Sequence, residues 1–322
     1  MLLAFRTYVF PPCSHVQITN ICQLDYLPKP PLSATDLSAE LDRINTLLHI
    51  RLNLHQNLPK HLQNFSIASG RVTFTLHGSF EMDLSILDED PSSRFYFIDF
   101  RFLFSPCSEI PTGQLRFEVE FRLNSILAAE GLIACFDFLQ DYVLTYKLSV
   151  LRRQALELSR SSWTGHLNVQ RIHRSLILHY WTQRPGKKSW IEIGVWSRKT
   201  VEGQQEQPRL NVKWMRYGKA VPDCLQVDDE DLDLEFFLNS VVSEHIQDLL
   251  KDAAAKLGIQ IPGAMTSNMR LQEGADGDAF LHVPIYSRAD MKLRIQEVTG
   301  NFAASPVDAT NERIVADLDG MR

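Results

Sequence analysis

The sequence lacks the cysteine, glycine and histidine patterns that mark several common kinds of chemical site. Its five cysteines include no Cys-x-x-Cys pair, and no histidine stands at zinc-finger spacing. Gly-x-Ser-x-Gly, Gly-x-Gly-x-x-Gly and His-Glu-x-x-His motifs are also missing. We therefore expect reduced, structural thiols, no resident metal or cofactor, and no catalytic activity.

Long hydrophobic runs are missing as well. No stretch approaches the ~18 apolar residues that a membrane-spanning helix needs. The opening MLLAFRTYVFPP is short and interrupted by Arg6, unlike a signal peptide. The 322 residues are 44% hydrophobic and 22% charged, which is typical of globular domains. We expect a soluble intracellular chain with two or three structural units.

Charge is divided unevenly along the chain. The formal net charge is −6, yet residues 147–219 hold 15 Lys or Arg against 4 Asp or Glu. The rest of the chain is correspondingly acidic. This division indicates that the basic middle is either a surface for an acidic partner or simply a solvated face.

The stretch from Ser69 to Pro106 has the pattern of a three-stranded antiparallel meander. Apolar and polar residues alternate over 72–76 and 80–86, and His77-Gly78 supplies a turn. Residues 95–104 are apolar at nearly every position on both faces. We therefore expect helices to cover both faces of this sheet.

Helices are expected on either side of the meander. Apolar residues at helical spacing predict one helix over 35–57, capped by Ser33 or Thr35 and ended by Pro59. The stretch 115–129 alternates like a strand but also has a helical stripe, and its strong helix formers before Gly131 favour a helix. A long helix over about 132–160 follows.

A similar order of elements comes next. Strands are predicted over 166–169, 175–182, 190–196 and 210–215, and a helix over 234–257 that ends at Gly258. Two further strands are predicted over 280–286 and 291–298, after which the residues 303–322 show no pattern.

These elements predict an α+β fold of tandem repeat modules, each a small antiparallel β-meander packed with long helices. The predicted division is an irregular leader over 1–24, a first module over 25–160, a second over 161–262, and a partial third module with a tail over 263–322.

Three short motifs have both a functional and a structural interpretation. Gly186-Lys187-Lys188-Ser189 resembles the end of a phosphate-binding loop, but a turn between two strands is favoured. The acidic run Asp228–Asp231 could hold a cation, but a solvated helix start is favoured. His173 and His179, predicted to share a strand face, have no third metal ligand.

The basic middle supplies the candidate binding residues. They form a predicted patch for an acidic partner surface: Arg152, Arg153, Arg171, Arg174, Lys187, Lys188, Arg198 and Lys199. Aromatic residues interleave with these positions, so the 147–219 region could instead bind single-stranded nucleic acid. We consider direct nucleic-acid binding the less favoured alternative.

Several segments resemble the subunit 14 family of the fungal Mediator of RNA polymerase II transcription. They are DYLPKPPL at 25–32, LDRINTLLHIRLNL at 41–54, SGRVTF at 69–74, DEDPSSRFYFIDFRFLFSP at 88–106, LSVLRRQALELSR at 148–160 and KSWIEIGV at 188–195. The resemblance implies a non-enzymatic scaffold of a nuclear coactivator, made of modules similar to RWD domains. Its implied partners are Mediator subunits of the head, the middle and possibly the tail, with RNA polymerase II as an indirect partner.

The resemblance also has limits. Members of that family begin with a longer helical region that engages the middle module, which residues 1–24 do not resemble, and they continue far beyond 322 residues. We therefore expect this chain to act as part of a longer scaffold in the nucleus, through contacts between proteins and without a membrane.

Overall fold

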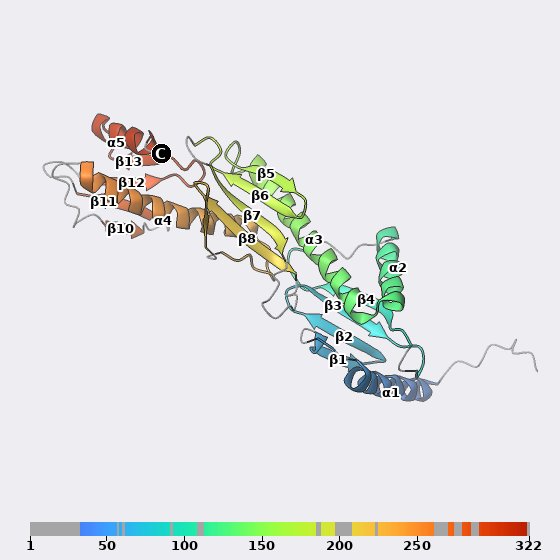
Figure 1. Ribbon diagram of the computed structural model, residues 1–322. Helices are drawn as coiled ribbons and strands as arrows, with labels where there is room; N and C mark the ends of the chain where they lie inside the picture. Colours follow the sequence, from blue (N-terminus) through green and yellow to red (C-terminus); the bar gives the residue numbers. More distant parts are fainter. Residues whose placement is uncertain are drawn as a thin grey trace, which may run out of the picture.

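The chain forms three antiparallel sheets that lie in a row, with long helices beside them (Figure 1). The computed structural model describes residues 33–56, 58–59, 62–90, 93–107, 113–184, 188–196, 208–222, 225–260, 270–273, 279–284 and 290–320. The leader 1–24 lies outside these residues. The α+β class predicted from the sequence is confirmed.

The first sheet has the strand order β1-β2-β3-β4. Its strands are β1 (Phe65–Ala68), β2 (Arg71–Leu76), β3 (Phe80–Ser85) and β4 (Tyr96–Phe102). The sequence predicted β2, β3 and β4, but not β1, which pairs with β2 at the edge of the sheet. Its helices are α1 (Ala34–Ile50), the π-helical turn η2 (Arg51–His55), α2 (Gln114–Ala129) and α3 (Leu132–Arg160). The predicted helices are confirmed, and the Ser33 side chain caps α1.

The second and third sheets repeat the simple up-and-down order. The second contains β5 (Asn168–Ile172), β6 (Ser175–Tyr180), β7 (Ser189–Trp196), β8 (Arg209–Arg216) and β9 (Lys219–Val221), followed by α4 (Leu234–Gln260). The third contains β10 (Arg270–Glu273), β11 (Ala279–Val283), β12 (Met291–Ile295) and β13 (Phe302–Ser305), followed by α5 (Ala309–Gly320).

Two predictions for the later elements are wrong. Helix α4 was expected to end at Gly258, but it continues to Gln260. The tail, expected to have no pattern, contains β13 and α5. The start of α5 carries a recognisable signal, because the Asp308 carboxylate accepts hydrogen bonds from the N–H groups of Thr310 and Asn311.

The first sheet is apolar on one face, not on both as predicted. A register shift in β4 pairs Asp83 with Asp99 but Leu84 with Phe97, so Ile98 is an extra residue. Because of this bulge, Phe97 and Phe100 lie on the same face, with ring centroids 6.1 Å apart. The opposite face carries polar pairs, among them Arg101 with Glu81 at 3.0 Å.

Helix α3 packs on both the first and the second sheet. In its N-terminal half, Phe136 contacts Phe80 with ring centroids 5.3 Å apart, and Tyr146 stacks on Phe102 at 4.9 Å. The same helix also contacts β5, β6 and β7. Helix α4 similarly packs against the second sheet and against β11 and β12 of the third. Each long helix is thus shared by two neighbouring sheets (Figure 1).

Three polar side chains, one every seven residues, follow one face of α3. Gln140 accepts from the Ser79 hydroxyl at 2.9 Å and donates to the Pro208 carbonyl at 3.2 Å. Gln154 donates to the Leu232 carbonyl at 2.7 Å and accepts from the Leu234 N–H at 3.2 Å. These bonds link α3 to the β2–β3 turn, to the residue before β8 and to the connection that leads into α4.

Lys147 lies between these two glutamines and is only 1% exposed. Its ammonium donates to the carbonyl of Gly78 at 2.6 Å, to the carbonyl of Asp229 at 2.8 Å and to the Asp229 carboxylate at 3.0 Å. Burial lowers the pKa of Lys147, although Asp229 acts in the opposite sense. Three acceptors satisfy the three N–H groups of the ammonium, as a buried charge requires.

The second and third sheets meet at Trp181. Its indole N–H donates to the Glu297 carbonyl at 2.5 Å. The backbone of Gly300 passes so close that a Cβ atom there would overlap the indole ring. The buried Arg184 guanidinium lies over the rings of Trp181 and Phe302, 5.0 Å and 5.7 Å from their centroids.

Replacing Lys147 by Met should lower the free energy of unfolding by about 2–3 kcal/mol, because buried carbonyls lose their donor. As a control, Asp229→Asn leaves an amide oxygen within reach of the ammonium and should cost less than about 1 kcal/mol. Urea unfolding followed by tryptophan fluorescence measures both. Equal losses in the two variants would show that the ammonium and its carbonyl partners do not dominate this contact.

Replacing Gly300 by Ala should loosen the contact between the second and third sheets, because the new methyl group meets the Trp181 ring. The expected cost is about 1–3 kcal/mol. Gly218→Ala is the matched control, because Gly218 also has a positive φ (79°) but nothing within 4 Å of a Cβ atom. Amide hydrogen exchange in β12 and β13 measures the effect, and equal exchange in both variants would contradict this explanation.

Candidate partner-binding surfaces

The described residues of the predicted basic patch lie on α3, on β5 and in two turns. Arg152 and Arg153 are exposed on α3, and Arg171 is exposed on β5, which α3 contacts. Arg174, in the turn after β5, forms an ion pair with Asp141 of α3 at 2.9 Å. Arg152, Arg153 and Arg171 therefore stand on neighbouring elements, whereas Arg174 already has an acidic neighbour.

Lys188 differs from these arginines. Its ammonium donates to the carbonyls of Thr182 and Arg184 in its own β6–β7 connection. Lys187, Arg198 and Lys199 lie outside the described residues. The basic patch therefore stays a prediction. Its five described members are all exposed, but Arg174 and Lys188 already bond other groups of the chain.

The acidic run Asp228–Asp231 was expected to be a solvated helix start. It instead lies against the end of the first sheet. Ser105 donates its N–H to the Glu230 carbonyl at 2.7 Å, and the Leu232 N–H donates to Ser105 at 2.6 Å. Helix α4 begins only at Leu234, where the Asp233 carboxylate accepts from the Phe236 N–H. The run thus belongs to the contact around Lys147.

The two histidines suggested as sharing a strand face do not do so. His173 lies in the turn before β6 with a positive φ of 50°, whereas His179 lies on β6 beside Trp190. Among the described residues, no three His, Cys, Asp or Glu side chains are grouped as a metal site would need. Gly186 and Lys187, predicted to form a turn, lie outside those residues.

A buried histidine network, which the sequence did not indicate, lies between the second sheet and α4. Trp214 donates its indole N–H to the Tyr180 hydroxyl at 2.8 Å, and that hydroxyl lies 2.9 Å from His245 Nδ1. The other ring nitrogen lies 3.1 Å from the Tyr217 hydroxyl. Burial lowers the pKa of His245 to about 3, so the ring is neutral. At 1% exposure this histidine stabilises packing and does not face a substrate.

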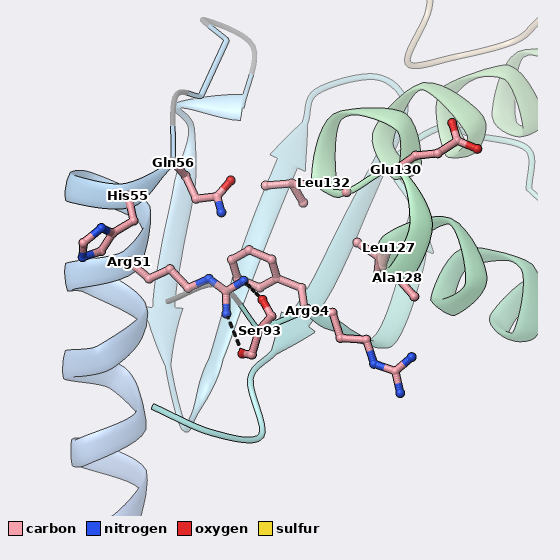
Figure 2. A pocket seen from close by; sticks show the side chains of 11 residues that line it. Arg51, His55, Gln56, Ser93, Arg94, Leu127, Ala128, Glu130 and Leu132 are labelled. Carbon is pink, nitrogen blue, oxygen red and sulfur yellow. Dashed lines mark hydrogen bonds between the residues drawn. The ribbon is translucent and has the colours of Figure 1, made fainter. Parts of the chain in front are cut away.

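A pocket of about 540 Å³ opens where η2, the start of β4 and the corner between α2 and α3 meet. Phe95, Leu127 and Leu132 are its buried apolar lining residues. Three basic side chains line it, Arg51, His55 and Arg94, against a single acid, Glu130. Figure 2 shows Arg51 reaching into this space, Arg94 extending on the side of Ala128, and His55 at the outer edge.

Arg51 is unusual because it is 5% exposed and only partly hydrogen-bonded. Its guanidinium stands over the Phe95 ring, 4.0 Å from the centroid, and donates to the Ser93 hydroxyl and carbonyl. Among the residues that the structure describes, its buried Nε–H has no partner. Burial lowers the pKa of Arg51, and the carboxylates of Asp88 and Asp90 act in the opposite sense. These two acids belong to the loop between β3 and β4 and do not line the pocket.

The N-terminal end of α3 forms another part of the same wall. Gly131 precedes the helix, offers no side-chain cap, and no acidic residue stands in the first turn. The first N–H groups of a helix have no partner within it and carry partial positive charge.

Sequence reasoning missed this pocket, because its walls come from segments far apart in the chain.

Helix α2 carries exposed aromatic side chains on the face that points away from the protein. Phe117 and Phe121 are 67% and 64% exposed, and their rings stack with centroids 6.5 Å apart. The opposite face buries Val119, Leu123 and Leu127. Two neighbouring phenyl rings in water are unfavourable unless another surface covers them.

No helix among the described residues combines the length and apolar character needed to cross a membrane.

The family model for Mediator complex subunit MED14 matches residues 14–88. The match begins inside the segment 1–24, where no resemblance was expected, and it extends through β3 into the loop that follows. It therefore covers α1, η2 and the first three strands of the first sheet.

Fungal relatives match nearly all of the chain. The Mediator of RNA polymerase II transcription subunit 14 of Aspergillus terreus is 37% identical over 309 residues, which is 94% of this chain and 28% of that protein. The corresponding protein of Emericella nidulans is 34% identical over 307 residues, with the same coverage. That of Pyricularia oryzae is 37% identical over 300 residues, 88% of this chain and 27% of its own length.

The chain thus spans about 28% of the length of these curated relatives. The matches run through all three sheets and are not confined to the segment that the family model covers. On this similarity, the chain belongs to the Mediator subunit 14 family.

Proposed function

We propose that the chain is a non-catalytic scaffold segment of the Mediator complex, which supports regulation of RNA polymerase II transcription in the nucleus through contacts between proteins. Family membership is the observation that carries this proposal. Its partners would be Mediator subunits of the head and middle modules, and possibly of the tail, with RNA polymerase II as an indirect partner.

The way the sheets are joined supports a scaffold role. Helix α3 packs on the first and second sheets, and α4 packs on the second and third. Buried polar contacts at Lys147 and aromatic contacts at Trp181 reinforce these two junctions. A scaffold needs surfaces held at fixed separation, and shared helices provide such a separation.

The modular division of the chain is part of this proposal. We assign one meander with its helices to each of the ranges 25–160, 161–262 and 263–322, and we propose that each is an RWD-like repeat. The leader 1–24 would precede them. One antiparallel sheet within each range is the observation that supports the assignment.

We propose the exposed basic residues on α3 and β5 as one contact surface within the assembly. Arg152, Arg153 and Arg171 are its exposed members on these two elements, whereas the equally exposed Arg174 and Lys188 already bond other groups of the chain. Nucleic-acid binding by the 147–219 region has less support, because Arg174 is paired with Asp141 and Lys188 bonds its own turn. Steep loss of binding to short DNA or RNA with added salt is what that alternative would require.

Co-expression tests the proposed function. The chain, produced with the head and middle subunits of a fungal Mediator, should co-purify in a stable complex through size-exclusion chromatography. A chain that elutes alone, while the other subunits assemble normally, would contradict the proposal. The same chain unfolded by heat before mixing serves as the control for non-specific association.

A further inference from the structure

We propose that the exposed face of α2 and the adjoining pocket form one docking surface for an amphipathic segment of another Mediator subunit. That segment would lay apolar side chains on Phe117 and Phe121 and place a carboxylate beside Arg51 and Arg94. This inference rests on the proposed scaffold function, and it names the chemistry of the partner at one site.

The apolar part of the surface follows from helical spacing. Phe117, Phe121 and Ala128 share one face of α2, because offsets of four and seven residues return to the same side of a helix. All three are exposed. This side of α2 runs from its N-terminal half to the corner with α3, where Ala128 lines the pocket. Between Phe121 and Ala128 it carries polar residues, among them Asn124, which accepts from the Phe97 N–H. The aromatic pair and the pocket are two ends of one surface.

The pocket determines the charge of the partner. Its two arginines and the uncapped N-terminal end of α3 face one acid among the lining residues, Glu130. Arg51 is 5% exposed, and its buried Nε–H has no partner among the described residues. Asp88 and Asp90, which do not line the pocket, are the acids that act on its pKa. A carboxylate is complementary to arginine and to the positive end of a helix.

Arg94 connects the two parts. Its side chain is exposed, stands over the Tyr96 ring at 4.7 Å from the centroid, and extends on the side of Ala128 (Figure 2). A segment lying along α2 would therefore meet Arg94 as it reaches the pocket. Apolar residues followed by an acidic one fit this order of chemistry, and helices with one apolar face commonly dock in such a manner.

The test uses the full chain in reconstituted complexes with the head and middle subunits. The double substitution Phe117→Asp/Phe121→Asp should weaken association about tenfold or more, because both rings lose their apolar contact. Arg94→Glu should weaken it about three- to tenfold and make the remaining affinity less sensitive to salt. All three positions are exposed in the free chain, so circular dichroism and the urea midpoint should stay unchanged.

Matched controls are available elsewhere on the chain. Phe236→Asp removes another exposed phenylalanine, 73% exposed at the start of α4, and Arg313→Glu reverses an exposed charge on α5. Both should bind as the wild type does. A photo-crosslinking phenylalanine analogue at 121 should attach to one segment of a partner subunit that contains Asp or Glu among apolar residues.

The outcomes separate this inference from the proposed function. Wild-type association together with unchanged binding of the double variant would overturn the docking surface and leave the scaffold function intact. Crosslinks from position 121 only to a second copy of this chain, or to a segment without acidic residues, would overturn it too. Failure of the wild type to associate at all would instead contradict the proposed function on which the inference rests.

Discussion

The buried ammonium of Lys147 is the constraint on which the arrangement of the first two sheets depends. A charged group that is 1% exposed must find hydrogen-bond partners inside the protein, because water cannot supply them. Its partners come from the β2–β3 turn and from the connection before α4. The turn, α3 and this connection therefore have to reach their positions together, and separating the first sheet from the second would break the hydrogen bonds of this buried ammonium.

This contact also gives part of the charge division along the chain a structural role. Lys147 stands at the beginning of the basic middle, and Asp229 belongs to the acidic run that follows it. Two further basic residues of the middle pair with acids on helices, Arg174 with Asp141 and Arg216 with Asp248. Several charges that look like a partner surface in the sequence thus connect elements within the fold.

Much of the fold could be predicted because local patterns decide it. Helix α3 begins and ends where the sequence places it, since Gly131 before it and continuous apolar spacing along it are local signals. The face pattern of β4 could not be predicted in this way. The extra residue Ile98 shifts the alternation by one, and a bulge is recognised from the pairing with β3, not from β4 alone. Strand β1 alternates in exposure, but with only four residues it is too short to be recognised from its pattern.

The candidate site was less predictable than the fold. Basic residues are visible in any sequence, but the pocket depends on which segments meet. Arg51 follows α1, Arg94 precedes β4, and Leu127 lies in the last turn of α2. Periodicity can predict that Leu127 is buried, but not that a partly bonded arginine lies beside it. The same holds for the histidine network, where Tyr180 and His245 meet only because α4 packs on the second sheet.

Because α3 is one continuous helix, its length sets how the second sheet is rotated relative to the first. The helix has 29 residues, or about 43 Å at 1.5 Å per residue, and its polar stripe repeats every seven. A single inserted residue would turn everything beyond it by about 100° and move Gln154 away from Leu232, whereas seven inserted residues would keep nearly the same direction. Seven inserted residues would still move the groups beyond them about 10 Å along the axis. The length of α3 therefore sets both the distance and the angle between the first sheet and the second.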